Sequence, residues 1–248
     1  MKKIFKVCLL VAIMLLTVRA TCGTKKIFDK PVQSMKIKDN VFYHNVGVTY
    51  DGRHFYTING GNDEYCVLNE YDKKGEFIEY YDVGVDGRAI FHHPRDGNLY
   101  IKNYGTDLYV VDLWDEVADI ELAGVFNEEN SSPAMSPDGK YLYEYSEGKV
   151  RVLDFETGDE VDQFKLSKWY DEHGYKYAIA ASREHLFVWS DEFEIAVYDL
   201  DGKYVTEIEL PRTGFGFSLS WCKDMLWIAR DADASSDGGD GYWYGYKL

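Results

Sequence analysis

Hydrophobic and polar positions alternate in short runs through most of this chain, and turn residues separate the runs. No long window places apolar residues at helical spacing. Alternation over about four to eight residues is typical of half-buried β-strands. The separating Asp-Gly, Asn-Gly and Gly-Gly pairs are typical of tight turns. Aromatic residues make up 16% of the chain, with 21 Tyr, and such residues suit a pleated surface. The pattern predicts an all-β protein.

The strand pattern repeats five times. Each unit has an apolar strand, a polar turn, and a second strand that is mostly apolar or aromatic, and the five openings are residues 46–56, 89–100, 133–143, 178–188 and 218–228. The turn positions 51, 96, 138, 184 and 223 are separated by 45, 42, 46 and 39 residues. Four strands in about 40–45 residues is the period of a propeller blade. The repeat therefore predicts a β-propeller of about five four-stranded blades; a six-bladed or incomplete propeller is the alternative.

A second signal, in phase with the first, marks the end of each third strand. An Asp follows an apolar residue or Tyr at positions 72, 112, 154 and 199, and a polar turn comes next. The fifth unit stops at residues 242–248, which align with third strands, whereas residues 26–37 form a spare strand at the other end. Pairing these ends would close the ring and remove two exposed sheet edges. We therefore expect the N-terminal strand to complete the last blade.

One blade resembles a known group. The segments Ser136-Pro137-Asp138-Gly139-Lys140-Tyr141-Leu142-Tyr143 and Val150-Arg151-Val152-Leu153-Asp154-Phe155-Glu156-Thr157-Gly158 resemble a blade of the WD40-like, YVTN-type bacterial propellers. The resemblance implies a fold. Its members range from cofactor-dependent enzymes to protein-interaction platforms, so it does not imply one function.

The first 21 residues differ from the rest. Lys2, Lys3 and Lys6 precede an apolar stretch, residues 7–18, which is too short to span a bilayer as a helix. This is the pattern of a secretory signal peptide. Cleavage after Ala20 or lipid attachment at Cys22 are the two expected routes. We therefore expect a signal peptide at 1–21, a single propeller domain at 22–248, and a bacterial protein that is periplasmic, secreted or an outer-membrane lipoprotein.

The net charge and the cysteine content limit the kinds of partner and of covalent link that we expect. Removing residues 1–21 takes away four cations and no anion, so the net charge falls from −16 to −20. Such a chain repels nucleic acids and anionic lipids. We expect a monomer that binds a protein or glycan partner and meets a membrane only through a lipid at Cys22. Cys66 and Cys222 fall on a third strand and at a turn after a first strand, so no disulfide is expected between them.

Candidate ligand-binding residues lie in two sets of loops, those that enter each first strand and those that join second to third strands. Loops on a rigid scaffold are where binding residues concentrate. Segment 168–175 is the densest in aromatic residues, which give large contact area at low entropic cost. The candidates are His44, Arg88, Asn103, Tyr104, Trp169, Tyr170, His173 and Arg212.

An acidic loop at 231–241 is a candidate cation site. Asp231, Asp233, Asp237 and Asp240 provide oxygens of the kind that Ca²⁺ prefers, although the spacing departs from the EF-hand pattern. A plain acidic loop without metal is the alternative, and no other cofactor is expected. No catalytic motif is present, so catalytic residues stay unassigned.

The sequence is compatible with three functions. The first is a non-catalytic extracytoplasmic propeller that binds a protein or glycan through its rim loops. The second is a hydrolase or lyase with carboxylates at the channel mouth. The third is a structural component of a cell-surface lipoprotein complex.

Overall fold

The computed structural model describes residues 28, 30–39, 41, 43–61, 66–169, 177–191, 193–231 and 240–248. The signal peptide and Cys22 therefore lie outside the described residues and stay predictions. The described chain consists of strands and loops, and no helix within it is long and apolar enough to cross a membrane.

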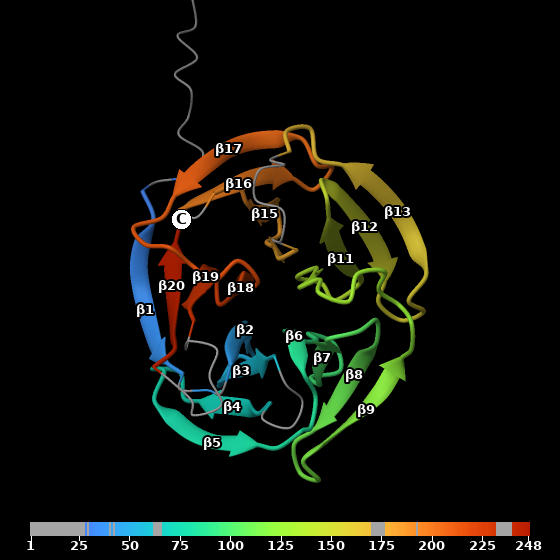
Figure 1. Cartoon of the computed structure of the whole chain (residues 1–248), viewed down its shortest axis with the longest axis vertical. Helices are drawn as coiled ribbons and strands as arrows, with labels where there is room; N and C mark the ends of the chain where they lie inside the picture. Colours follow the sequence, from blue (N-terminus) through green and yellow to red (C-terminus); the bar gives the residue numbers. More distant parts are fainter. Residues whose placement is uncertain are drawn as a thin grey trace, which may run out of the picture.

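Five antiparallel sheets of four strands each are arranged around a central axis (Figure 1). Blade 1 has β2 (His44–Tyr50), β3 (Phe55–Gly60), β4 (Leu68–Tyr71) and β5 (Phe77–Tyr81). Blade 2 has β6 (Gly87–His92), β7 (Leu99–Asn103), β8 (Leu108–Asp112) and β9 (Val117–Leu122). Blade 3 has β10 (Ala134–Met135), β11 (Tyr141–Ser146), β12 (Lys149–Asp154) and β13 (Glu160–Lys165). Blade 4 has β14 (Ile179–Ala181), β15 (His185–Trp189), β16 (Glu194–Asp199) and β17 (Tyr204–Glu209). Blade 5 has β18 (Ser220–Cys222), β19 (Met225–Arg230), β20 (Tyr242–Lys247) and β1 (Val32–Lys38).

The prediction that the N-terminal strand closes the ring is confirmed. Strand β1 pairs antiparallel with the C-terminal strand β20, from Val32 opposite Lys247 to Lys38 opposite Tyr242. Figure 1 shows the first and last strands of the described chain side by side on one edge of the ring. The pairing supplies the fourth strand that the fifth repeat lacks. The predicted number of blades and the all-β class are both confirmed.

The hydrophobic core is divided into five clusters, and each lies between two consecutive blades. For example, Ile58 of blade 1 packs with Ile101 of blade 2, and Trp227 of blade 5 packs with Phe55 of blade 1. The strands of the second and third positions supply most of these side chains because both of their faces are covered. Cys66 and Cys222 are buried in this framework and are not joined by a disulfide.

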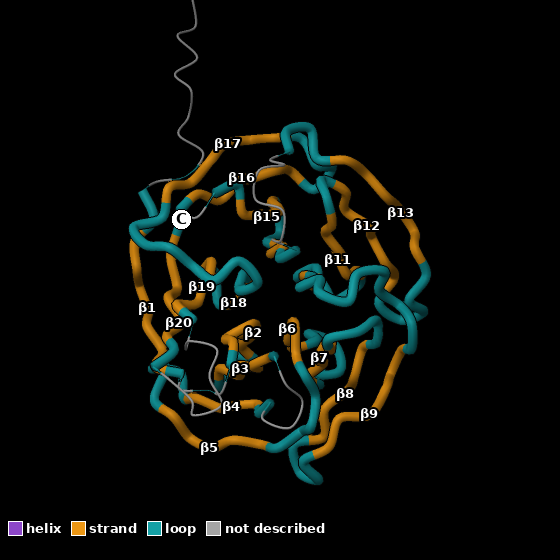
Figure 2. The backbone as a smooth tube through the Cα atoms, in the orientation of Figure 1, coloured by secondary structure: helices purple, strands orange, loops and turns teal. Residues whose placement is uncertain are grey.

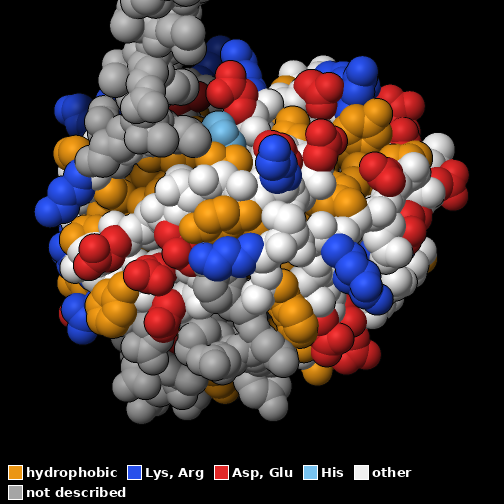
Figure 3. Space-filling view, turned by 90° about the horizontal axis from the view of Figure 1, so that it is seen from above, with side chains coloured by type: hydrophobic (Ala, Val, Ile, Leu, Met, Phe, Trp, Pro, Cys, Tyr) orange, Lys and Arg blue, Asp and Glu red, His pale blue; other side chains and the backbone are white. Residues whose placement is uncertain are grey.

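The fourth strand of each blade forms the outer wall, and buried and exposed side chains alternate less strictly along it. Its exposed side chains are mixed, and Figure 3 shows one side of the wall with acidic, basic and hydrophobic groups interspersed. Most hydrophobic side chains that remain exposed lie on these strands, such as Phe77 and Tyr80 of β5.

The ring has two ends, and Figure 2 looks along its axis, from one end toward the other. At what we term the entry end lie the loops that lead into each innermost strand and those that join second to third strands. At the turn end lie the tight turns that join first to second and third to fourth strands. This follows from antiparallel pairing, which returns the chain to the same end after every two strands.

Candidate functional site

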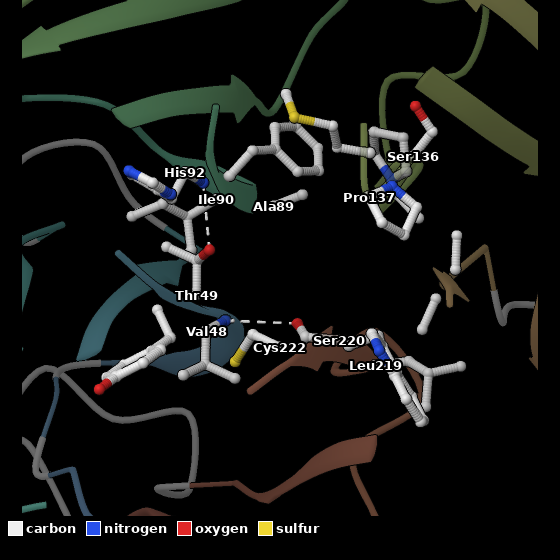
Figure 4. A pocket seen from close by; sticks show the side chains of 18 of the residues that line it. Val48, Thr49, Ala89, Ile90, His92, Ser136, Pro137, Leu219, Ser220 and Cys222 are labelled. Atoms are coloured by element: carbon white, nitrogen blue, oxygen red, sulfur yellow. Dashed lines mark hydrogen bonds between the residues drawn. The ribbon is translucent and has the colours of Figure 1, made fainter. Parts of the chain in front are cut away.

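A cavity of about 280 Å³ lies on the axis, toward the turn end (Figure 4). All five innermost strands contribute to its walls, which combine apolar side chains such as Val48, Ile90 and Leu219 with the hydroxyls of Thr49, Ser136 and Ser220. Arg183, Lys223 and Asp224 also line it. The cavity is small for a drug-sized ligand, for which sites of about 300 Å³ or more are usual.

Two hydroxyl groups in this cavity, those of Thr49 and Ser220, join adjacent blades. The Thr49 hydroxyl of blade 1 accepts a hydrogen bond of 3.1 Å from the backbone N–H of His92 in blade 2. The Ser220 hydroxyl of blade 5 accepts one of 3.3 Å from the N–H of Val48 in blade 1. Both bonds are drawn in Figure 4. Innermost strands have no sheet neighbour on the axis side, so these hydroxyls satisfy backbone groups that would otherwise be unpaired.

The cavity lacks the acids that hydrolysis would use. Its described lining includes one carboxylate, that of Asp224. His92 also lines it, and burial lowers the pKa of its imidazole, which favours the neutral ring at pH 7. The described lining therefore has one carboxylate and two cationic side chains, Arg183 and Lys223.

At the entry end, His44 is held in a fixed orientation at the start of β2. Its Nδ1 lies 2.5 Å from Oδ2 of Asp231, and its ring stacks on Phe215 at 4.7 Å between centroids. The second Asp231 oxygen accepts a 3.0 Å hydrogen bond from the N–H of Asn45. The His44 side chain is 31% exposed. Blade 5 therefore provides both the carboxylate and the aromatic ring that orient a histidine of blade 1.

Arg88 is held in a similar way at the start of β6. Its Nη1 donates to Oδ1 of Asp86 at 2.5 Å, and its guanidinium lies 4.6 Å from the centre of the Tyr104 ring. Tyr104 follows β7 and is 46% exposed. Asp86 and Arg88 are two residues apart, so both side chains point to the same face of the extended chain.

Two glycines fit between these residues. The N–H of Gly61 donates to the Asp86 carboxylate at 2.8 Å. Gly61 has φ +123°, and a Cβ there would lie 3.3 Å from the His44 ring; a Cβ on Gly60 would overlap the Arg88 guanidinium. Only glycine allows the loop after β3 to pass this closely. We define the His44–Arg88 site as His44, Asp86, Arg88, Tyr104, Phe215 and Asp231.

A buried hydrogen-bond network lies beside this site, at the loop that enters blade 3. Lys102 of β7 is fully buried, and its Nζ donates to the carbonyls of Glu128 and Glu129 at 3.0 and 2.5 Å. Burial lowers the pKa of Lys102 to about 7. The buried Glu144 carboxylate accepts hydrogen bonds from the backbone N–H groups of Asn127 and Glu128. These two side chains therefore fix the loop that enters blade 3.

The structure groups some of the predicted binding residues and separates others. His44, Arg88 and Tyr104 lie in the site, and Asn103 fixes the turn beside Tyr104 by accepting a hydrogen bond from the N–H of Asp107. Arg212 instead points to the outer strands, where it bonds Gln33 and stacks on Tyr244.

Trp169 lies at the entry end of blade 3. It packs on the turn at Gly148, where a Cβ would be 2.6 Å from its Cγ, and it is 44% exposed. Its neighbours Tyr170 and His173 lie outside the described residues. Segment 168–175 therefore stays a prediction as a binding loop.

Sequence reasoning missed Asp86 and Phe215. Asp86 had a signal, its spacing of two residues from Arg88. Phe215 lies in a predicted entry loop, but no local pattern indicates its contact with His44, because the closed ring brings the loop before β18 next to that residue.

Two of the four predicted calcium ligands, Asp231 and Asp240, lie within the described residues. Asp231 pairs with His44, and Asp240 forms a 2.9 Å ion pair with Lys38. Asp233 and Asp237 lie outside the described residues. The part of the chain that is described holds no group of three or more metal-ligating side chains. Calcium binding by the full loop therefore stays a prediction.

Comparison of the chain with protein-family models and with curated proteins found no match to either.

Proposed function

We propose that this chain is a non-catalytic, exported propeller that binds a neutral glycan or a protein loop at the His44–Arg88 site. One observation carries the proposal: two basic side chains near the axis, His44 and Arg88, each stack on an aromatic ring and each pair with a carboxylate. Groups fixed in this way lose little entropy when a ligand binds.

The charges of the site favour an uncharged polar ligand. Asp86 neutralises Arg88, and Asp231 lies against His44, so among the described residues the site offers no unpaired cation to an anionic ligand. The Arg88 bonds to Asp86 and to the Gly87 carbonyl both use Nη1. Nε and Nη2 are then the guanidinium donors for a ligand hydroxyl or carbonyl, and the exposed Tyr104 ring provides a surface on which a sugar or side chain packs.

The two alternatives have less support. A glycoside hydrolase of the usual kind uses two carboxylates in one cavity, and the described lining of the central cavity has the single carboxylate of Asp224. A role in a surface lipoprotein complex rests on lipid at Cys22. Mass spectrometry of the mature N-terminus tests that role directly.

The experiment is calorimetric titration of the full mature chain with a panel of neutral oligosaccharides. For a sugar that binds, Tyr104→Ala and His44→Ala should each weaken affinity by about tenfold, as expected from loss of about 1.4 kcal/mol of contact. Tyr80→Ala is the matched control, because Tyr80 is an exposed tyrosine of the outer wall. A protein partner is tested with the same three variants. A ligand that binds Tyr80→Ala more weakly than the native chain, but binds Tyr104→Ala and His44→Ala with unchanged affinity, would contradict the proposed site.

A further inference from the structure

A second hollow, of about 550 Å³, lies between blades 1 and 2 at the turn end, away from the His44–Arg88 site. Blade 1 contributes Asp51 and Tyr56 to it, and blade 2 contributes Asp112, Trp114 and Asp119. Trp114 is 92% exposed, more than any other large hydrophobic side chain in the described chain.

The fold does not need a tryptophan at this position. In four blades the turn between third and fourth strands is closed in the same way: an Asp carboxylate accepts the N–H of the residue two positions later. The pairs are Asp72 with Lys74, Asp112 with Trp114, Asp154 with Glu156, and Asp199 with Asp201, at 2.7 to 3.1 Å. Three of the four later positions carry a charged residue. Since the same turn forms with Lys, Glu or Asp, the turn does not require the indole.

The surface around Trp114 is strongly acidic. Between residues 112 and 121 there are five acids, Asp112, Asp115, Glu116, Asp119 and Glu121, and no Lys or Arg. The hollow itself is lined by the carboxylates of Asp51, Asp112 and Asp119 and by no basic side chain. Within the described chain none of these three forms an ion pair, so their charges are not neutralised by a neighbouring cation.

The acids are too widely placed for a single metal ion, since the described residues contain no group of three metal-ligating side chains. A larger cation matches the hollow better. A guanidinium or ammonium group on a flexible side chain gains from an aromatic face, most of all from Trp, and from carboxylates spread around it.

The surface continues along β9, which favours a protein segment over a free small cation. Strand β9 is the outermost strand of its sheet, so one edge of its backbone is unpaired. Val117 and Ile120 on it are 43% and 54% exposed, and they lie on opposite faces of the strand beside that edge. An extended segment can pair with such an edge and cover apolar side chains, which a small cation does not do.

We propose that this surface docks a basic segment of a protein partner, with an Arg or Lys side chain inserted between the Trp114 indole and the carboxylates of Asp51 and Asp119. Charge complementarity and the exposed indole, which the turn does not require, carry the proposal. It goes beyond the proposed function, because it concerns the opposite end of the ring and a basic ligand.

The test is fluorescence anisotropy with the full mature chain and a labelled nine-residue peptide of alternating Arg and Val. We expect saturable binding at low ionic strength. Trp114→Gln should weaken it by about 5- to 30-fold, the range expected for loss of a cation–π contact. Asp119→Asn should weaken it by a smaller factor. Gln replaces the indole without adding charge, and Tyr80→Gln on β5 is the matched control, expected to change affinity less than twofold.

Stability and specificity are measured in parallel. The melting temperature of Trp114→Gln should stay within about 2 °C of the native value, because the side chain is exposed. Failure of the native chain to bind the peptide would overturn the proposal. Equal binding by Trp114→Gln, or equally tight binding of a Glu-Val peptide or of arginine amide alone, would also overturn it. None of these results bears on the His44–Arg88 site, which the oligosaccharide titrations test separately.

Discussion

Asp39, in the connection from β1 to β2, is the residue whose loss should most damage the closed ring. Its side chain is fully buried and accepts four hydrogen bonds. One oxygen receives Asn69 Nδ2 at 3.0 Å and the Tyr71 hydroxyl at 2.6 Å. The other receives Asn45 Nδ2 at 2.9 Å and Trp243 Nε1 at 2.7 Å. The donors belong to blades 1 and 5, so the carboxylate joins the first blade to the strand pair that closes the ring.

The expected cost follows from these contacts. A hydrogen bond to a charged group contributes about 1.5–3 kcal/mol, and removing the acceptor leaves buried donors unpaired. Water entering the vacated space offsets part of the loss, so we expect Asp39→Ala to lower the free energy of unfolding by about 4–5 kcal/mol. For a chain of this size that corresponds to a fall in melting temperature of about 10–20 °C. Asp39→Asn, which keeps the shape but turns an N–H₂ group toward two donors, should lose about half as much free energy.

The assay is urea unfolding followed by tryptophan fluorescence, with thermal melts as a second measurement. Asp201→Ala is the control, because Asp201 is exposed on a turn and its loss should change stability by less than about 0.5 kcal/mol. If Asp39→Ala melts within about 2 °C of the native chain, the buried carboxylate does not hold the closure, and the reasoning is refuted.

Three further predictions concern other parts of the ring. Burial lowers the pKa of Lys102 to about 7, so between about pH 7 and 10.4 this side chain is protonated in the unfolded state and neutral in the folded state. The free energy of unfolding should therefore rise with pH over that window. The midpoints of urea unfolding should show this rise for the native chain and lack it for Lys102→Met. Gly148→Ala should displace Trp169 and lower the free energy of unfolding by more than about 1 kcal/mol, because Gly148 has φ +77° and the added Cβ would meet the indole. A thermal melt measures the loss of stability, and acrylamide quenching of Trp169 fluorescence measures the displacement. Deleting residues 32–38 removes β1 and leaves β20 with an open edge; we expect oligomers by size-exclusion chromatography, and a stable monomer would show that closure is dispensable.

The repeat and its closure were predictable from sequence because they rest on local chemistry. Alternation sets the strands, and an Asp at each turn, such as Asp112 or Asp154, accepts the N–H two residues on wherever it occurs. The spare strand at 26–37 was recognisable because the last repeat ended one strand short; the structure places it at Val32–Lys38.

The sites were only partly predictable. The loops that carry His44, Arg88 and Tyr104 follow from the blade pattern, since every entry loop reaches the same end of the ring. That these residues lie together, while Arg212 points to the outer wall, depends on how each side chain packs.

By itself the sequence determined the strands, the turns, the number of blades and the strand that completes the ring, because each depends on residues a few positions apart or on counting repeats. Tertiary structure alone decided that Asp231 orients His44 across 187 residues, that Asp39 joins the first and last blades, and that Lys102 is buried. The physical reason is the closed ring, which brings the two ends of the chain into contact and buries polar groups whose partners no local pattern identifies.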